Sequence, residues 1–323
     1  MRRIKLTIAY DGTNYKGWQI QQPSPEQPEG RVPTIQGCLQ RALGELLPKE
    51  AVLLNTEAAS NAAEDKANAG VRAAGDADAR TEPRPGLEAQ PGFLPVVGAS
   101  RTDSGVHALG NVACFDTECT IPVANFPKAI NRFLPADIRV MKAEEVSADF
   151  HPRFVPHTKC YEYHVDNGPQ ANPLTRLYAY HYTYPLDLDR MHAAAEKLVG
   201  IHDFTSFVNP DSQVFEHGGD AVREIYSIDI EKSGAMLVFR FRGNGFLYHM
   251  IRILVGTLLS VGNGRRAPEE IETMLAAKDR TASGPTVPAH GLCLCALEYP
   301  ADLTASQPSD ASEEAERPAE GGS

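Results

Sequence analysis

The stretch that carries the most information in this chain is Ser100-Arg101-Thr102-Asp103-Ser104-Gly105-Val106-His107-Ala108. It places one carboxylate, Asp103, in a tight turn two residues after a cation, Arg101. Gly98 and Gly105 bracket the acid, and glycine permits the positive φ that a sharp reversal needs. A nearby positive charge favours an ionised acid, so we expect Arg101 to keep Asp103 charged. An aspartate that caps its own turn is the alternative, and spacing alone favours this alternative.

Hydrophobic periodicity on both sides of this turn predicts a mixed structure. Ile4, Leu6 and Ile8 alternate with polar residues, which predicts a strand. An apolar stripe at helical spacing predicts a helix over 35–47 with Thr34 as its N-cap. Further strands are expected at 112–115, 138–146, 159–165, 223–230, 236–242 and 292–299, and further helices between 124 and 134, at 188–199, from 246 and from 267. This order predicts an α+β fold with largely antiparallel sheets and helices on one face.

Length and composition predict a soluble protein of two domains. The chain has 323 residues, of which 42% are hydrophobic and 23% are charged, as in ordinary globular proteins. The longest apolar helix candidate, 247–261, is too short to span a bilayer and contains Arg252. The N-terminus lacks the pattern of a secretory signal peptide. We therefore expect a cytoplasmic protein without a membrane segment.

Two segments are expected to be disordered and therefore mark the domain organisation. An insertion over about 51–95 is rich in Ala, Glu, Asp, Gly and Pro, and it has no aromatic residue before Phe93. The acidic tail over 301–323 is equally low in complexity. We expect an N-terminal domain over 1–148, which carries Asp103 and the insertion, and a C-terminal α+β domain over 149–300.

The charge distribution leaves room for a polyanionic partner despite a net charge of −11. The insertion carries −3 and the tail −5, so the remaining 255 residues, with 26 bases and 29 acids, carry only −3. The bases either cluster into a basic cleft or lie scattered and solvated. The candidates for the cleft are Arg2, Arg3, Lys5, Arg101, Arg153, Lys159, Arg240, Arg242, Arg252, Arg265 and Arg266. The six cysteines and the histidines show no spacing typical of metal sites, so we expect no metal.

Several further motifs accompany the Asp103 turn in a fixed order. They are Ala9-Tyr10-Asp11-Gly12-Thr13-Asn14-Tyr15-Lys16-Gly17-Trp18-Gln19, Lys159-Cys160-Tyr161-Glu162-Tyr163, His202-Asp203-Phe204-Thr205-Ser206-Phe207, Gly243-Asn244-Gly245-Phe246-Leu247-Tyr248-His249-Met250-Ile251-Arg252 and Gly291-Leu292. Together these segments closely resemble the bacterial tRNA pseudouridine synthase A family, and the resemblance covers about 3–50 and 96–300. The chain departs from the family pattern in its long insertion and in Lys159-Cys160, where the family often has arginine.

The resemblance implies an isomerase that converts uridine to pseudouridine at positions 38, 39 and 40 of the tRNA anticodon stem-loop. It also implies two similar α/β halves with sheets joined end to end, a central basic cleft, a homodimer, and no cofactor or metal. The catalytic aspartate of the family matches Asp103, and its base-stacking tyrosine matches Tyr161. Arg101 matches the arginine implicated in extruding the nucleotide, and Arg252 matches the cation that pairs with the catalytic carboxylate.

The chemistry of the reaction agrees with these roles. A carboxylate can serve as nucleophile or as base toward the sugar, and either role requires it to be ionised in a partly dry site. A buried carboxylate without a companion cation takes up a proton instead, which is the reason for pairing Asp103 with Arg252. A flipped base needs an aromatic floor, which Tyr161 would supply. Arg153, Lys159, Arg265 and Arg266 would contact phosphates.

Two alternatives stay open at this point. A non-catalytic RNA-binding protein of the same fold would keep the basic cleft, although the presence of Asp103, Arg101, Tyr161 and Arg252 together argues against it. A glycoside hydrolase also breaks a bond at an anomeric carbon, but it needs two facing carboxylates. No second acid stands out in the motifs.

Overall fold

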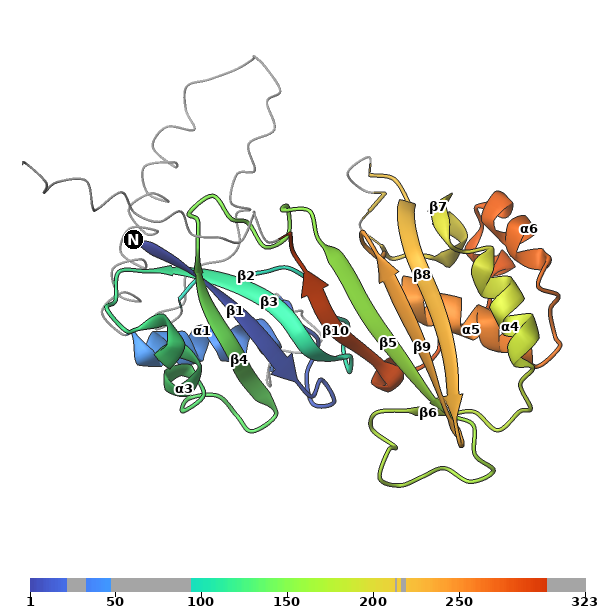
Figure 1. Cartoon of the computed structure of the whole chain (residues 1–323), viewed down its shortest axis with the longest axis horizontal. Coiled ribbons are helices and arrows are strands. Elements are labelled where there is room, and N and C mark those ends of the chain that lie inside the picture. Colours follow the sequence, from blue (N-terminus) through green and yellow to red (C-terminus); the bar gives the residue numbers. More distant parts are fainter. Residues whose placement is uncertain (22–32, 48–93, 213, 216–218, 301–323) are drawn as a thin grey trace, which may run out of the picture.

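The computed structural model describes residues 1–21, 33–47, 94–212, 214–215 and 219–300. Its strands are β1 (Arg2–Tyr10), β2 (Val97–Gly98), β3 (His107–Thr117), β4 (Ile138–Val146), β5 (Thr158–Asp166), β6 (Tyr180–His181), β7 (Gly200–Asp203), β8 (Val222–Ser233), β9 (Met236–Gly243) and β10 (Leu292–Glu298). They form one ten-stranded sheet in the order β4-β1-β3-β10-β5-β9-β8-β7, with β2 beside β3 and β6 beside β5. Figure 1 shows this sheet running along the whole length of the molecule.

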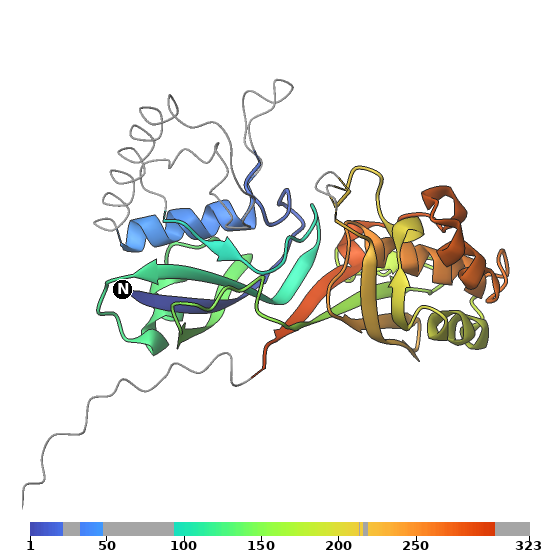
Figure 2. The same ribbon diagram turned by 90° about the horizontal axis from the view of Figure 1, so that it is seen from above.

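The helices pack on the sheet as their amphipathic sequences require. They are α1 (Ile35–Leu46), α3 (Phe126–Ile130), α4 (Leu188–Glu196), α5 (Met250–Gly262) and α6 (Glu270–Ala277). The side chain of Thr34 accepts a hydrogen bond from the Gly37 N–H and so caps α1, as predicted. In the view of Figure 1, α1 lies behind the strands of one half and α5 behind those of the other, and Figure 2 shows the same layers from above. The predicted α+β architecture is confirmed.

The last strand of the chain joins the two halves of the sheet. β10 pairs antiparallel with β5 and parallel with β3, and the parallel contact has only two register pairs, His107 with Cys293 and Ala108 with Leu294. Apart from β10 and the two-residue β6, every strand pairing in the described residues is antiparallel. The two sheets that the resemblance implies are therefore one continuous sheet with a narrow joint between β3 and β10.

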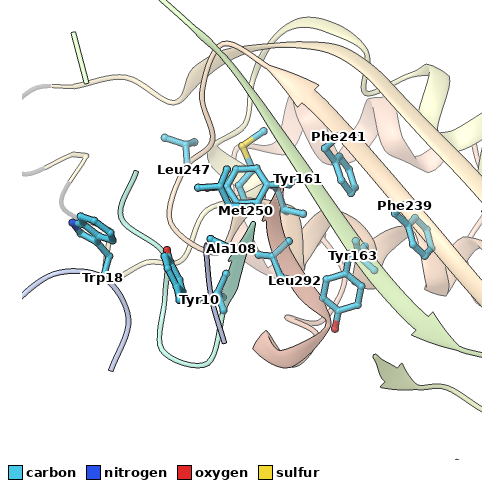
Figure 3. Packing of buried hydrophobic residues seen from close by; sticks show 14 of the residues in the cluster. Tyr10, Trp18, Ala108, Tyr161, Tyr163, Phe239, Phe241, Leu247, Met250 and Leu292 are labelled. Atoms are coloured by element: carbon cyan, nitrogen blue, oxygen red, sulfur yellow. The ribbon is translucent and has the colours of Figure 1, made fainter. Parts of the chain in front are cut away.

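A single hydrophobic core continues across this joint. It contains Tyr10 and Ala108 from one half together with Leu292, Tyr161 and Met250 from the other. Figure 3 shows these side chains gathered around the joint, with the ring of Tyr161 close to Met250. The division of the chain at residue 148 stays a prediction, because the core and the sheet both extend over the two proposed domains.

Two predicted helices begin later than expected. The helix predicted from Phe246 begins at Met250, because 244–249 form a loop that ends with His249 in a left-handed conformation. The helix predicted from Ala267 begins at Glu270, with Pro268 in the preceding turn. The short strands β2, β6 and β7 were not predicted, because two to four residues carry too little periodicity to be recognised.

The segments predicted to be disordered lie almost entirely outside the described residues. The tail over 301–323 lies outside them, as does the insertion except for its last two residues. Of these two, Leu94 is buried. No helix in the described ranges is long and apolar enough to cross a membrane.

We predict that Gly110→Ala destabilises the joint between β3 and β10. A Cβ atom at Gly110 would lie 2.5 Å from the backbone oxygen of Cys295, and backbone cannot yield as a flexible side chain can. Overpacking of this kind typically lowers the free energy of unfolding by about 1 to 3 kcal/mol, measurable by urea denaturation. Gly245→Ala is the control, because its nearest neighbour would be the Arg223 side chain at 3.7 Å. Equal stability of the two variants would contradict the prediction.

Candidate active site

Asp103 lies in the loop between β2 and β3, and the backbone of this loop turns tightly as predicted. The Val106 N–H donates to the Asp103 carbonyl at 3.2 Å, and Gly105 has a φ of +77°. The Asp103 carboxylate contacts Arg252 and His249 rather than the backbone of its own turn. The alternative of an aspartate that merely caps its turn is therefore wrong.

The segment after β1 holds the Asp103 loop in place. The Trp18 N–H donates to the Thr102 carbonyl at 3.0 Å, and the Gly105 N–H donates to the Tyr15 carbonyl at 3.3 Å. Gly17 has a φ of +80°, and a Cβ atom there would lie 2.5 Å from the Thr102 oxygen. The first motif of the chain and the Asp103 motif therefore form one closely packed backbone unit.

A buried polar network supports the same loop from below. The Tyr10 hydroxyl lies 2.7 Å from Thr102 Oγ1, and the Asn111 side-chain amide donates both to Tyr10 and to the Ser100 carbonyl, at 3.1 Å each. Burial raises the pKa of Tyr10 well above its usual range, so its hydroxyl stays protonated. Because each member has partners, the network fixes the loop without leaving unsatisfied groups.

His107 ties the loop to the second half of the molecule. The Gly12 N–H donates to His107 Nδ1 at 3.1 Å, and Asp11 Oδ1 lies 3.2 Å from the same nitrogen. Nε2 lies 3.0 Å from the Leu177 carbonyl and 3.2 Å from the His290 carbonyl. The imidazole therefore connects three segments that are distant in sequence, directly beside the joint between β3 and β10.

The structure brings Arg252 to Asp103 although 149 residues separate them. Arg252 Nη1 lies 3.4 Å from Asp103 Oδ2, and its Nε donates to the Val287 carbonyl at 2.8 Å. The two side chains are only 13% and 19% exposed, so water screens their attraction less than on an open surface. Arg101 is exposed on the same loop as Asp103, and the ion pair that faces the carboxylate is the one with Arg252.

The environment of Asp103 perturbs its carboxyl group. Burial raises the pKa of its carboxyl group, and the charge and hydrogen bond of Arg252 offset this effect only in part. Arg252 and His249 both approach Oδ2, whereas Oδ1 has no hydrogen-bond partner among the described residues. One oxygen is thus anchored while the other is available to a substrate, as a nucleophile or a base requires.

Tyr161 lies in β5 at the same site. Its hydroxyl is 3.0 Å from Ser100 Oγ, and its ring makes an edge contact with Phe246 at a centroid distance of 5.5 Å. Burial raises its pKa to about 12, so the hydroxyl is neutral at physiological pH. The Lys159 ammonium reaches the same Ser100 Oγ at 3.4 Å. Ser100 thus links the Asp103 loop to two residues of β5.

Many of the bases that we expect to line a basic cleft form ion pairs with acidic side chains. Five of these pairs have an N···O distance of 2.7 Å, and the other two have distances of 3.1 and 3.3 Å. The pairs are Arg2 with Glu145, Arg3 with Asp116, Lys5 with Glu144, Arg240 with Glu162 and Glu231, Arg242 with Glu298, and Arg266 with Glu270. Arg265 lies over the ring of Tyr184. Arg266, which was predicted to contact phosphate, therefore has Glu270 as its partner in this structure.

A smaller cationic cluster remains beside Tyr161. Burial, together with the neighbouring charges of Arg153 and Arg223, lowers the pKa of Lys159 to about 8. The Arg153 guanidinium also donates to the Gly98 carbonyl at 3.2 Å, next to the Asp103 loop. Like charges held together in this way raise the local affinity for an anion. No group of three or more His, Cys, Asp or Glu side chains within the described ranges is placed to hold a metal ion.

Sequence reasoning missed three residues of this site: Ser100, Asn209 and His249. Ser100 and His249 lie inside the quoted motifs, but their roles depend on contacts with distant segments. Asn209 lies 40 residues from His249, whose ring it contacts, and nothing in its local sequence marks it.

Comparisons with known proteins show that the chain belongs to the tRNA pseudouridine synthase family. The family model described as "tRNA pseudouridine synthase" matches residues 6–155 and 194–300. A protein named tRNA pseudouridine synthase A from Bacillus pumilus (strain SAFR-032) is 40% identical over 297 residues, which cover 92% of this chain and 99% of that protein. The protein of the same name from Moorella thermoacetica (strain ATCC 39073 / JCM 9320) is 38% identical over 298 residues, which cover 92% of this chain and 99% of that protein.

Among solved structures, a Cbf5-Nop10-Gar1 complex shares 16% identity over 52% of this chain and 37% of that chain. Its TM-score of 0.27 is too low to carry an argument.

We predict that the ionisation of Asp103 makes the fold less stable as pH rises. A carboxyl group with a raised folded-state pKa holds its proton more tightly when folded, so the free energy of unfolding falls from about pH 3.8 upward. Asp103→Asn does not ionise and escapes this loss. Its stability relative to the parent should therefore increase with pH and level off near neutrality.

Urea denaturation at a series of pH values measures this difference. The attraction of Arg252 for the ionised carboxylate is already contained in the folded-state pKa of Asp103, so it needs no separate correction in this comparison. A stability difference that stays constant with pH would contradict the prediction.

Proposed function

Because the chain belongs to the tRNA pseudouridine synthase family, we propose that it isomerises uridine to pseudouridine in tRNA and that Asp103 is its catalytic residue. The observation that carries the assignment is the asymmetric carboxylate: Oδ2 is anchored by Arg252, while Oδ1 has no partner among the described residues. The resemblance places the target uridines in the anticodon stem-loop.

The isomerisation requires the enzyme to break the glycosidic bond, rotate the uracil and rejoin its C5 to the sugar. Asp103 acts on the sugar as nucleophile or as base, and both roles use the ionised form that Arg252 favours. A site that is mostly closed to water retains the detached base during its rotation. The raised pKa of the Asp103 carboxyl group keeps its oxygen more basic than that of an exposed aspartate, which favours both roles.

The target uridine must leave its stem, at a cost of roughly a few kcal/mol. Stacking on an aromatic ring returns about 1 to 3 kcal/mol, and Tyr161 offers such a ring near the Asp103 loop. Ser100 and Phe246 fix the orientation of that ring. Arg101, which is exposed and lies two residues before Asp103, stabilises the everted nucleotide.

Phosphate contacts come from the cluster of Arg153 and Lys159. Binding of a phosphate beside Lys159 returns its ammonium toward full protonation, because an anion favours the charged form. Such contacts position the RNA without reading its sequence. A homodimer and a cytoplasmic location, which the resemblance implies, remain predictions.

The glycoside hydrolase alternative finds no support in this geometry. The two side chains that contact the Asp103 carboxylate are an arginine and a histidine, so the facing pair of carboxylates that such enzymes need is not present there. A non-catalytic RNA-binding protein would not need a buried, anchored acid, and the experiment below separates it from an enzyme.

We predict that Asp103→Asn binds tRNA but loses turnover by at least about a hundredfold, because the amide can serve neither as nucleophile nor as base. Release of tritium from tRNA labelled at uridine C5 measures turnover, because this hydrogen is lost only when C5 bonds to the sugar. Filter binding measures affinity. Asp229→Asn, an exposed position on β8, is the matched control and keeps full activity. Tritium release at the parental rate would mean that another residue is catalytic.

We predict that Tyr161→Leu lowers kcat/KM by about 5- to 150-fold, which corresponds to the stacking energy of roughly 1 to 3 kcal/mol. Tyr161→Phe keeps the ring and loses only the contact with Ser100, so it should lose much less activity. Steady-state kinetics with the anticodon stem-loop as substrate distinguishes the two variants. Equal losses in Phe and Leu variants would show that the hydroxyl, not the ring, is what the reaction needs.

A further inference from the structure

His249 has an unusual backbone conformation at the point where it enters the site. Its φ of +62° lies in the left-handed region, and Lys278 is the only other non-glycine residue with a positive φ among the described residues. Such a conformation costs of the order of 1 to 3 kcal/mol and persists only where surrounding contacts impose it. The strain places the His249 ring one turn before Arg252, with Nε2 3.5 Å from Asp103 Oδ2.

Asn209 imposes this conformation from a different segment. Its backbone N–H donates to the Tyr248 carbonyl at 3.2 Å, directly before the strained residue. Its side-chain Nδ2 lies 2.8 Å from His249 Nδ1. The Tyr248 ring packs on the His249 ring with a centroid distance of 3.9 Å. The imidazole is therefore held from two sides.

The hydrogen bonds in this group leave only one arrangement of protons. The Asp211 N–H donates to Asn209 Oδ1 at 2.9 Å, so the amide turns its Nδ2 toward the histidine. Because Nδ2 is only a donor, His249 Nδ1 must accept, and a neutral ring then carries its proton on Nε2. Nε2, which carries this proton, lies 3.5 Å from the anchored oxygen of Asp103.

The histidine is neutral in this setting. Burial lowers its pKa to about 4, and the charges of Arg252 and Arg280 act in the same direction, whereas Asp211 opposes them. The groups that face Asp103 are Arg252 from α5, Tyr248 and His249 from the preceding loop, and Tyr161 from β5. Among the described residues, Arg252 supplies the positive charge that contacts the carboxylate, and His249 supplies an uncharged N–H.

We propose that His249 is a positioning residue for the reaction, which donates its Nε2–H to Asp103 Oδ2 because Asn209 fixes its tautomer. Together with Arg252, it holds Oδ2 from two directions and directs Oδ1 toward the sugar. The contact of 3.5 Å is long for a hydrogen bond, and catalytic contacts of this kind commonly shorten when the substrate binds. The proposal rests on the proposed function in one respect, namely that Asp103 is the reactive group.

The first test measures the tautomer of His249 directly, in the full chain without RNA. Nitrogen-15 NMR of histidine-labelled protein should show a neutral Nε2–H ring from about pH 5.5 to 8, with the signal assigned by its loss in His249→Phe. Asn209→Asp presents a carboxylate to Nδ1, so it should place a proton there and raise the pKa of His249. A parental ring that carries its proton on Nδ1 would overturn the proposal.

The second test measures the effect on Asp103. In His249→Phe the carboxyl group loses a donor but keeps an apolar ring beside it, so its pKa, followed by carbon-13 NMR, should rise. The acid limb of the pH profile of kcat/KM should move to higher pH, with a loss of about tenfold at neutral pH. His202→Phe on β7 is the control and leaves both unchanged, because that histidine bonds to the Val199 carbonyl and contacts the Phe204 ring, and it has no contact with Asp103 among the described residues. An unchanged pKa of Asp103 in His249→Phe would overturn the proposal.

The nearly isosteric Asn209→Asp keeps the proposal testable if His249→Phe does not fold. Above the raised pKa of His249, the neutral ring of this variant keeps its proton on Nδ1 and presents the lone pair of Nε2 to Asp103. The activity of the variant should therefore fall as the pH rises through this pKa, whereas the activity of the parent should not. An Asn209→Asp pH profile that matches the parent would contradict the proposal. Both NMR results are obtained without turnover, so they hold or fail independently of whether the chain forms pseudouridine.

Discussion

The contact between Asp103 and Arg252 is the interaction on which the rest of the site depends. Burial alone would drive the carboxyl group toward its neutral form, and the guanidinium is the cation that opposes this. Arg252 comes from α5 in the second half of the sequence, whereas Asp103 comes from the first. The acid therefore acquires its working charge state only when the two halves are held together at a fixed distance.

The joint between β3 and β10 supplies that distance. The joint has only two register pairs, which is a small contact for holding the two halves at a fixed distance. His107 reinforces the joint through its contacts with Gly12, Leu177 and His290. Close backbone contacts at Gly17 and Gly110 leave little room for the neighbouring segments to shift. A shift of one ångström at this joint would move Arg252 relative to Asp103 and change the pKa of the acid. The continuous core around Tyr161 and Met250 resists such a shift because packed interiors deform little.

The sequence predicted those features that local patterns determine. The cap at Thr34, the alternation in β5 and the turn at Asp103 each follow from residues close together in the chain. The ion pairs that the cleft candidates form could not be predicted, because Arg242 and Glu298 meet only through strand register across β5. The pairing of Asp103 with Arg252 came from the family resemblance rather than from spacing. The left-handed backbone of His249 has no sequence signature, since its cause is Asn209.

The surroundings of Asp103 favour its proposed chemistry but lower the stability of the folded state. The features that support the proposed role of Asp103 are its burial, its raised pKa and an Oδ1 without a partner among the described residues, and they also make its ionised form unfavourable in the folded state. The strained backbone of His249 adds to this cost. The buried network of Tyr10, Thr102 and Asn111 lies directly under the loop and uses all its polar groups, so it provides compensation where the strain arises. We conclude that the dense hydrogen bonding around 100–107 keeps a destabilised group in place, and that a looser loop would let Asp103 turn to solvent and lose its raised pKa.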